Sequence, residues 1–347
     1  MFKMNSDKIK GMILGHALGD ALGAPVEFYP YSYYTGKLDV PITRYTRAYG
    51  KQVSDIGQIS DDTEMAIILL KTIINGYTKV KAITNYMIWA NNQFENCKGK
   101  SPFMGKNTRN LFVAPKPTYK LYKNRFCKFY PDNITKENSQ SNGALMRAYA
   151  YIFTKEDIIR EDVFITNPSE LVYNCVSVYT AAIRMALLNV PKKVIQDKVK
   201  DMIEFEELSI AYEQACTNSF RNVTYNRGHI IHAFYCAFWG LFQFDNYKDA
   251  IDSIICLGPK ADEPAKISMK GKWKKTEVLV GDTDTNASIA GALLGAYYGY
   301  DNMIQNEVTK TNINTLLNCD STRGDIIRPP DYRMNQVFID HILDIFC

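Results

Sequence analysis

Acidic residues stand in pairs beside apolar segments at three places in the sequence. The pairs are Asp20 with Glu27 in GDALGAPVEF, Asp61 with Asp62 in SDDTEM, and Asp282 with Asp284 in GDTDT. Hydroxyl side chains flank the second and third pairs, namely Ser60, Thr63, Thr283 and Thr285. Carboxylates are costly to bury unless their charge is compensated. These three stretches are therefore the first candidates for a functional site.

Helix capping explains each acidic pair when it is taken alone. Asp, Ser and Thr before a helix accept hydrogen bonds from its free N–H groups, and negative charge there suits the helix dipole. Asp61 and Glu64 even have the spacing of a capping box. A cap needs only one acid, however, and each site has two. No Lys or Arg immediately adjoins the pairs at 61–62 and 282–284.

Divalent cations would compensate the same charges. Carboxylate and hydroxyl oxygens form a ligand set that suits Mg²⁺, Mn²⁺ or Ca²⁺ rather than zinc. Asp61, Asp62, Asp282 and Asp284 supply four negative charges, which balance two divalent ions, and Glu27 adds a fifth. Two metals held by carboxylates are typical of hydrolysis or phosphoryl transfer.

Helical periodicity dominates the segments that must position these acids. We predict helices at 6–24, 65–74, 82–94, 144–153, 168–189, 191–205, 207–219, 229–244, 246–257, 286–300 and 332–346. The stretch 29–59 is rich in turn residues, and 99–141 is predicted as loop with short helical turns. No hairpin or β-α-β pattern is present. The sequence therefore predicts an all-α fold, a compact single-domain helical bundle over 1–347, with the charged stretch 259–279 as a surface insertion.

Glycine placement adds two expectations. Gly11, Gly15, Gly19 and Gly23 recur at intervals of four in the first predicted helix. Because glycine disfavours an isolated helix, this stripe predicts close approach of another backbone. In SQSNGALMR, the Asn142–Gly143 turn precedes a helical pattern. It is either an ordinary turn or a loop whose N–H groups bind an anion.

Composition excludes several classes of protein. The formal charge of +4 and a pI near 8.4 demand neither nucleic acid nor an anionic membrane as a partner. No stretch of 18 consecutive apolar residues predicts a membrane span, and no signal peptide is expected at the N-terminus. Eight widely spaced cysteines without a C-x-x-C pair favour reduced thiols and a cytoplasmic location. His229 and His232 are expected to be core or cap residues, because no H-E-x-x-H pattern accompanies them.

Four of these stretches together resemble the ADP-ribosylglycohydrolase family, whose bacterial members include the dinitrogenase-reductase-activating glycohydrolase. They are GHALGDALGAPVEF, SDDTEM, SNGALMR and GDTDTNASIAGALLGAYYG, in the order that the family has them. The resemblance implies a single all-α domain with a two-metal centre, usually Mg²⁺ or Mn²⁺, at the mouth of a cleft. The implied metal ligands are Ser60, Asp61, Asp62, Asp282, Asp284 and Thr285.

The resemblance also implies roles for residues around the metals. Glu27 and Asp62 are the candidate catalytic residues, and Glu27 is the acid expected to handle protons. Asn142 and Gly143 inherit contact with ADP-ribose, and Asp20 is placed with them as a supporting, substrate-binding residue. His16, in the first motif, is expected to be structural.

Two features depart from the family pattern. Many relatives have a Thr-His pair after the glycine loop, whereas FITNPSELV has Asn167 at the position of the His. Asn167 is also predicted to cap the next helix, with Pro168 at its first position and Glu170 at its third. The second departure is the Lys-rich insertion 259–279, which either selects an acidic target or is a solvated surface loop.

The implied activity is hydrolysis of the bond between C1 of the distal ribose and a modified acceptor. Arginine is the first choice of acceptor; serine, O-acetyl-ADP-ribose and nucleic acid stay open, although a nucleic-acid partner is not expected. The partner would be an ADP-ribosylated protein or a small molecule that contains ADP-ribose. Two alternatives remain, a protein that binds ADP-ribose without catalysis and a Mg²⁺-dependent prenyl-diphosphate enzyme with an acid-rich motif.

Overall fold

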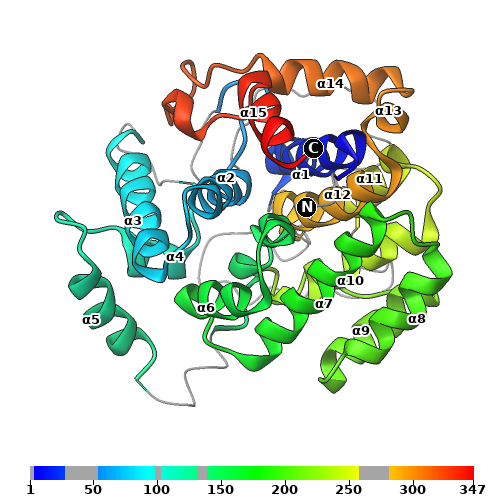
Figure 1. The fold of residues 1–347 in the computed structure, drawn as a ribbon, viewed down its shortest axis with the longest axis horizontal. Helices are drawn as coiled ribbons and strands as arrows, with labels where there is room; N and C mark the ends of the chain where they lie inside the picture. Colours follow the sequence, from blue (N-terminus) through cyan, green and yellow to red (C-terminus); the bar gives the residue numbers. More distant parts are fainter. Residues whose placement is uncertain (1–3, 28–53, 98–102, 132–138, 258–280) are drawn as a thin grey trace, which may run out of the picture.

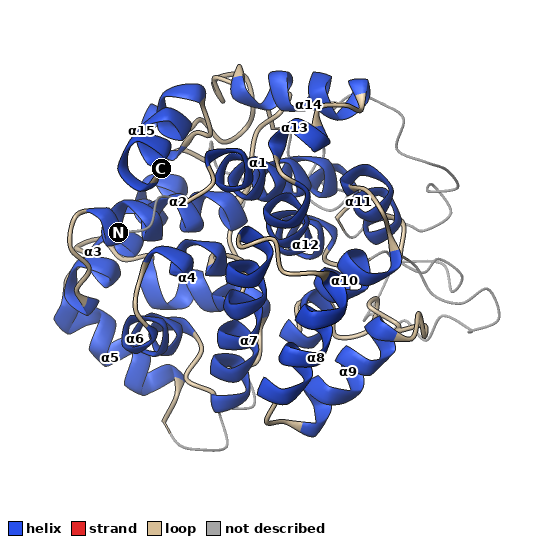
Figure 2. Cartoon of the chain, turned by 45° about the vertical axis from the view of Figure 1, so that its right-hand side comes forward, coloured by secondary structure: helices blue, strands red, loops and turns tan. Residues whose placement is uncertain are grey.

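Helices form nearly all of the regular structure in this computed structural model, which describes residues 4–27, 54–97, 103–131, 139–257 and 281–347. Figures 1 and 2 show their arrangement. The helices are α1 (Ser6–Gly23), α2 (Asp61–Ile74), α3 (Lys79–Glu95), α4 (Lys106–Phe112), α5 (Tyr119–Phe129), α6 (Glu156–Thr166), α7 (Glu170–Leu187), α8 (Lys192–Met202), α9 (Glu206–Cys216), α10 (Ile230–Gln243), α11 (Tyr247–Ile255), α12 (Thr283–Tyr298), α13 (Tyr300–Met303), α14 (Glu307–Leu317) and α15 (Gln336–Phe346). The described residues contain no strand beyond one isolated bridge between Ser141 and His229. The all-α prediction is confirmed.

Two glycine-rich helices, α1 and α12, lie against each other at the centre of the fold (Figure 1). Their small residues meet in reverse order: Gly11 with Gly295, Gly15 with Gly291, Gly19 with Ala287, and Gly23 with Thr283. A Cβ atom at Gly15 would collide with the carbonyl oxygen of Gly291, and one at Gly291 with that of Gly15. Backbones therefore touch directly, as the glycine stripe predicts.

This antiparallel contact has a consequence for the acids. It places the C-terminal end of α1, which carries Asp20, beside the N-terminal end of α12, which carries Asp284. The Thr283 hydroxyl fixes the register by donating to the Gly23 carbonyl at 2.8 Å. On either side of this pair, α7, α10 and α11 pack against α12, while α13, α14 and α15 pack against α1.

Several element predictions were wrong or incomplete. The stretch 99–141 contains α4 and α5, and α6, α13 and α14 were not predicted. Residues 144–153 form 3-10 turns, of which Ala148–Phe153 is the longest, rather than an α-helix. Asn167 ends α6 and does not cap α7, which begins after Ser169. The predicted insertion 259–279 and most of 29–59 lie outside the described residues.

In the ranges that the structure describes, no helix is both long enough and apolar enough to cross a bilayer.

Candidate functional site

Three helix ends bring the acidic pairs together. Carboxylate oxygens of Asp20, Asp62 and Asp284 lie within 4.8 Å of one another, and so do those of Glu27, Asp282 and Asp284. Asp284 belongs to both groups. Residues more than 220 positions apart in the sequence therefore share one site, as the metal hypothesis requires.

Asp20 holds the start of α2 from the side of α1. Its carboxylate accepts hydrogen bonds from the Ser60 N–H at 3.1 and 3.0 Å, from the Thr63 N–H at 3.1 Å and from the Thr63 hydroxyl at 2.6 Å. The side chain is completely buried and is not among the described residues that line the cavity. These contacts give Asp20 a role in positioning the start of α2, and its assignment as a supporting, substrate-binding residue stays a prediction.

A cavity of about 320 Å³ opens over the remaining acids. Its described lining consists of Glu27, Asp61, Asp62, Met104, Gly105, Lys106, Asn107, Thr108, Ser141, Asn142, Gly143, Met146, Gly228, Asp282, Asp284 and Thr285. All eight predicted site residues other than Asp20 and Ser60 are in this set: Glu27, Asp61, Asp62, Asn142, Gly143, Asp282, Asp284 and Thr285. Ser60 lies behind the wall, where its hydroxyl donates to Asp62 Oδ2 at 2.9 Å.

The acids in this wall repel one another. Burial raises the pKa of Asp62 well above its usual range, and the charges of Asp61, Asp20 and Asp282 raise it further. Burial likewise raises the pKa of Asp284, with added repulsion from the carboxylates of Glu27, Asp282, Asp62 and Asp20. Burial raises the pKa of Asp20 less, to about 6, because hydrogen bonds from Thr63 and Ser60 oppose the effect of burial.

The donor set fits divalent cations. Asp62 Oδ1 is buried and has no hydrogen-bond partner among the described residues, so one lone-pair face of this carboxylate is available to an ion. Capping does not account for the acids: Ser60 caps α2, whereas Asp282 at the start of α12 makes no side-chain capping bond. Among the described residues, the fully buried arginines are Arg147 and Arg328, and both pair with other carboxylates.

The Asn142–Gly143 turn lines the same cavity and is tied to the acids. Asn142 Nδ2 donates to Asp282 Oδ2 at 2.8 Å, and the Asn142 N–H donates to the Gly228 carbonyl at 2.9 Å. Asn167 supports the turn from behind, since its Nδ2 donates to the Ser141 carbonyl at 3.1 Å and to the Ser141 hydroxyl at 3.0 Å. The residue that departs from the family pattern therefore holds this loop.

The histidines lie where structural roles are expected. His16 is buried, its Nε2 lies 2.8 Å from the Met146 carbonyl oxygen, and burial lowers its pKa to about 3. His229 caps α10 by accepting from the Ile231 N–H. His232 is buried on α10, where its Nε2 lies 2.8 Å from the Tyr225 carbonyl oxygen.

Sequence reasoning missed one wall of the cavity. Residues 104–108, at the start of α4, face the acids, and the Gly105 N–H donates to Asp61 Oδ2 at 3.3 Å. Nothing in the polar composition of this stretch marks it as part of the site, because its contribution depends on tertiary placement.

Known proteins with related sequences and structures carry consistent descriptions. A family model described as ADP-ribosylglycohydrolase matches residues 3–267 and 278–319. The chain is 24% identical over 325 residues to ADP-ribosylhydrolase ARH3 of Xenopus tropicalis, which covers 86% of this chain and 89% of that protein. It is 23% identical over 311 residues to ADP-ribosylarginine hydrolase Tri1 of Pseudomonas putida strain GB-1, which covers 86% of this chain and 72% of that protein.

The fold has a counterpart among solved structures. A chain described as "ADP-ribosylglycohydrolase-related protein complex" superposes with a TM-score of 0.59 at 20% sequence identity, covering 89% of this chain and 97% of that chain. At this level of identity the likeness establishes the fold, and the site's chemistry must come from the residues described above.

Proposed function

Because the chain belongs to the ADP-ribosylglycohydrolase family, we propose that it is a metal-dependent hydrolase that removes ADP-ribose from a modified acceptor. The bond cleaved is the one between C1 of the distal ribose and the acceptor. The observation that carries the proposal is the convergence of Asp62, Asp284 and their neighbouring acids on a cavity that the Asn142–Gly143 turn also lines.

Two divalent cations, Mg²⁺ or Mn²⁺, are proposed as cofactors. Asp61, Asp62, Asp282, Asp284 and Thr285 would hold them, with Ser60 orienting Asp62 through its hydroxyl. Bound cations of this kind grip vicinal hydroxyls of a sugar and stabilise charge that changes in the transition state. The unpartnered Asp62 Oδ1 and the mutual repulsion around Asp284 support this assignment.

Glu27 is proposed as the residue that moves protons. It lies directly after α1 and its 3-10 turn, in the cavity wall, with a carboxylate oxygen within 4.8 Å of those of Asp282 and Asp284. In hydrolysis, water adds to C1 as the bond from C1 to the acceptor breaks. Glu27 takes a proton from the water and passes it to the leaving acceptor, which gives ADP-ribose and the free side chain.

The Asn142–Gly143 turn in the cavity wall is proposed to hold the substrate. The Asn142–Gly143 turn is fixed on both sides, by Asp282 and Gly228 in front and by Asn167 behind. A fixed turn lowers the entropy that binding must lose. Asn142 and Gly143 are therefore proposed to position ADP-ribose with its distal ribose over the acids.

Arginine is the proposed acceptor, which makes the scissile bond N-glycosidic. Two bound divalent ions would balance the four aspartates, which leaves the Glu27 carboxylate in the cavity wall to complement a cationic guanidinium group. One relative, Tri1, is named an ADP-ribosylarginine hydrolase. The cell compartment proposed is the cytoplasm, because none of the eight cysteines, all of which lie in the described ranges, forms a disulfide bond.

Incubation with mono-ADP-ribosylated arginine and serine peptides tests the reaction and the acceptor together. We expect release of free ADP-ribose from the arginine peptide in Mg²⁺ or Mn²⁺, and loss of release in EDTA. Asp61→Ala and Asp284→Ala should each reduce turnover by about 10²- to 10³-fold, the scale of losing one essential electrostatic stabiliser. An active double variant would refute the assigned ligands.

A second candidate function is binding of ADP-ribose without catalysis, and Asn167 is the observation that favours it. This residue replaces the family's His and is committed to the loop through Nδ2. Calorimetric binding of ADP-ribose together with no release from either peptide would select this alternative.

A further inference from the structure

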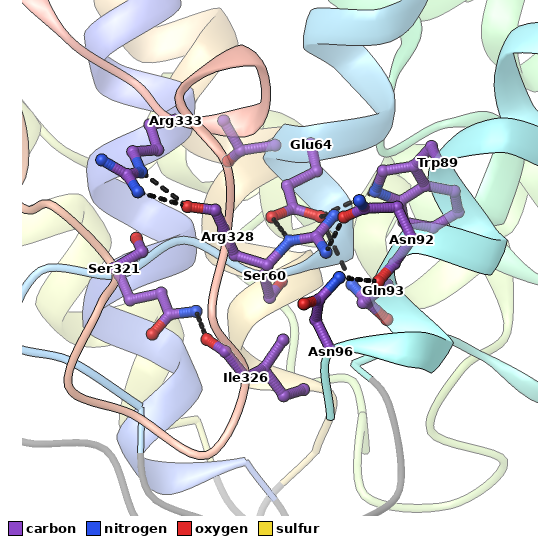
Figure 3. Close-up of polar contacts among 12 residues, drawn as sticks. Ser60, Glu64, Trp89, Asn92, Gln93, Asn96, Ser321, Ile326, Arg328 and Arg333 are labelled. Carbon is purple, nitrogen blue, oxygen red and sulfur yellow. Dashed lines mark hydrogen bonds and ion pairs between the residues drawn. The ribbon is translucent and has the colours of Figure 1, made fainter. Parts of the chain in front are cut away.

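A buried ion pair lies directly behind the acidic turn of α2. Glu64 and Arg328 are each about 1% exposed. Arg328 donates through Nε to Glu64 Oε1 at 2.6 Å and through its Nη2 group to Glu64 Oε2 at 2.8 Å. Figure 3 shows this two-bond contact and the residues around it. The fork geometry fixes the carboxylate in direction as well as in distance.

The first turn of α2 carries this carboxylate and the proposed metal ligands together. Glu64 lies two positions after Asp62, and its N–H donates to the Ser60 carbonyl at 3.2 Å. Its Oε2 also accepts from Trp89 Nε1 at 2.7 Å and Gln93 Nε2 at 3.3 Å, both on α3. A shift of Glu64 would therefore move the backbone of Asp62.

The arginine is itself held by its own segment, residues 321–333. Its N–H donates to the Ser321 carbonyl at 3.1 Å, and its carbonyl accepts from Arg333 Nε at 2.7 Å. Two residues earlier, the Ile326 carbonyl accepts from Gln58 Nε2 at 2.9 Å, just before the cap of α2 (Figure 3). The segment thus contacts α2 both before and after the acidic pair.

We propose that Arg328 is a positioning residue that fixes Asp61 and Asp62 in their metal-binding arrangement through Glu64. This inference rests on the proposed metal centre. Segment 321–333 lies beyond residue 319, where the family match ends. A buried ion pair adds little net stability compared with well-packed apolar residues, whereas residues that orient metal ligands have large effects on affinity.

Manganese binding tests the role without measuring turnover. The electron paramagnetic resonance signal of free Mn²⁺ reports the Mn²⁺ dissociation constant for wild type, Arg328→Met and Arg328→Lys. We expect Arg328→Met to weaken binding by about 10- to 100-fold, the range for such outer residues. Arg328→Lys keeps the positive charge but loses the two-bond contact of the guanidinium, so its Mn²⁺ affinity should lie between those of Arg328→Met and wild type.

A matched control separates positioning from general loss of stability. Leu208→Ala on α9 removes a fully buried side chain remote from α2, and should lower the melting temperature while leaving Mn²⁺ affinity within about twofold of wild type. Glu64→Gln combined with Arg328→Met should bind Mn²⁺ no more weakly than Arg328→Met alone, because both act through one contact.

The outcomes distinguish the two proposals. Wild-type affinity in folded Arg328→Met, or in Arg328→Lys where the former does not fold, would overturn the positioning role and leave the metal centre standing. An equal loss of affinity in Leu208→Ala would also overturn it. Wild-type protein that binds no Mn²⁺ would refute the proposed metal centre and the positioning role together.

Discussion

Asp62 and Glu64 lie two residues apart on α2, yet their buried carboxylates have opposite surroundings. Glu64 faces the Arg328 guanidinium and two further donors on α3. Asp62 faces the cavity and other carboxylates, which together with burial raise its pKa. One turn of helix therefore has a neutralised side and a side on which negative charge accumulates.

A second ion pair, Arg147 with Asp162, shows that the neutralised arrangement is the structural solution. Arg147 Nε donates to Asp162 Oδ2 at 2.9 Å, and the Tyr151 hydroxyl donates to the same oxygen at 2.7 Å. Both side chains are completely buried. Where the fold needs a buried acid for its own stability, it supplies an arginine and hydroxyl donors. In the proposed function, the acids at 62 and 284 serve a different purpose, which is binding of a cation.

The largest change in stability is expected when the ion pair between Arg147 and Asp162 is broken. Asp162→Asn leaves the Arg147 charge buried without its partner, so the free energy of unfolding should fall by about 3–5 kcal/mol. Urea unfolding followed by circular dichroism measures the change, with Asp331→Asn on the exposed Lys71 pair as the control. A loss below about 1 kcal/mol would show that this pair is no more important than a surface pair.

Cation binding should stabilise the protein by compensating the negative charge around Asp62 and Asp284. At a free Mn²⁺ concentration 100 times its dissociation constant, mass action adds about 2.7 kcal/mol of stability. The rise in melting temperature should be reversed by EDTA. It should be smaller at pH 5 than at pH 7.5, because the raised pKa values of Asp62 and Asp284 let protons compete with the ion. An unchanged melting temperature at both pH values would contradict the metal centre.

Sequence alone predicted the acidic side of this comparison and missed the neutralised side. The acidic pairs and the glycine stripe are local patterns, and the partner stripe at Gly291 and Gly295 is visible within a second helix. By contrast, Glu64 meets an arginine 264 positions away. The capping box suggested for Asp61 and Glu64 was therefore wrong, because a tertiary partner took the Glu64 carboxylate.

The missed helices have a similar physical reason. α5 and α14 are polar and contribute few fully buried side chains, such as Tyr122 on α5. Packing against neighbouring elements decides their conformation. Asn167 was misassigned because its sequence resembles a cap, whereas its amide is used by Ser141 in the glycine loop. Local patterns thus predicted the site's acids better than the contacts that hold them.

His16 is a buried base without a compensating charge, and its burial makes the stability of the protein depend on pH. Burial lowers the pKa of His16 to about 3, so the unfolded chain binds its proton more readily between that value and about 6.5. The stability that neutral His16 contributes is complete above pH 6.5 and is lost as pH falls. Between pH 6.5 and 5 the loss should be about 2 kcal/mol. His16→Gln keeps a donor for Met146 and should lose less over this range; parallel curves for the two proteins would contradict the shift.

The smallest expected change in stability is that of Asp284→Asn, and it should be an increase. Asp284→Asn removes one charge from a cluster that also contains Glu27, Asp282 and Asp62. In EDTA at pH 7.5 this variant should therefore be more stable than wild type, by about 1 kcal/mol, as expected where function retains a destabilising group. In Mn²⁺ it should gain less than wild type does, because a ligand is missing. Urea unfolding in both buffers measures the two differences. A destabilised Asp284→Asn in EDTA would place Asp284 with Asp162, as an acid that the fold itself requires, and would remove the distinction between the two sides of α2.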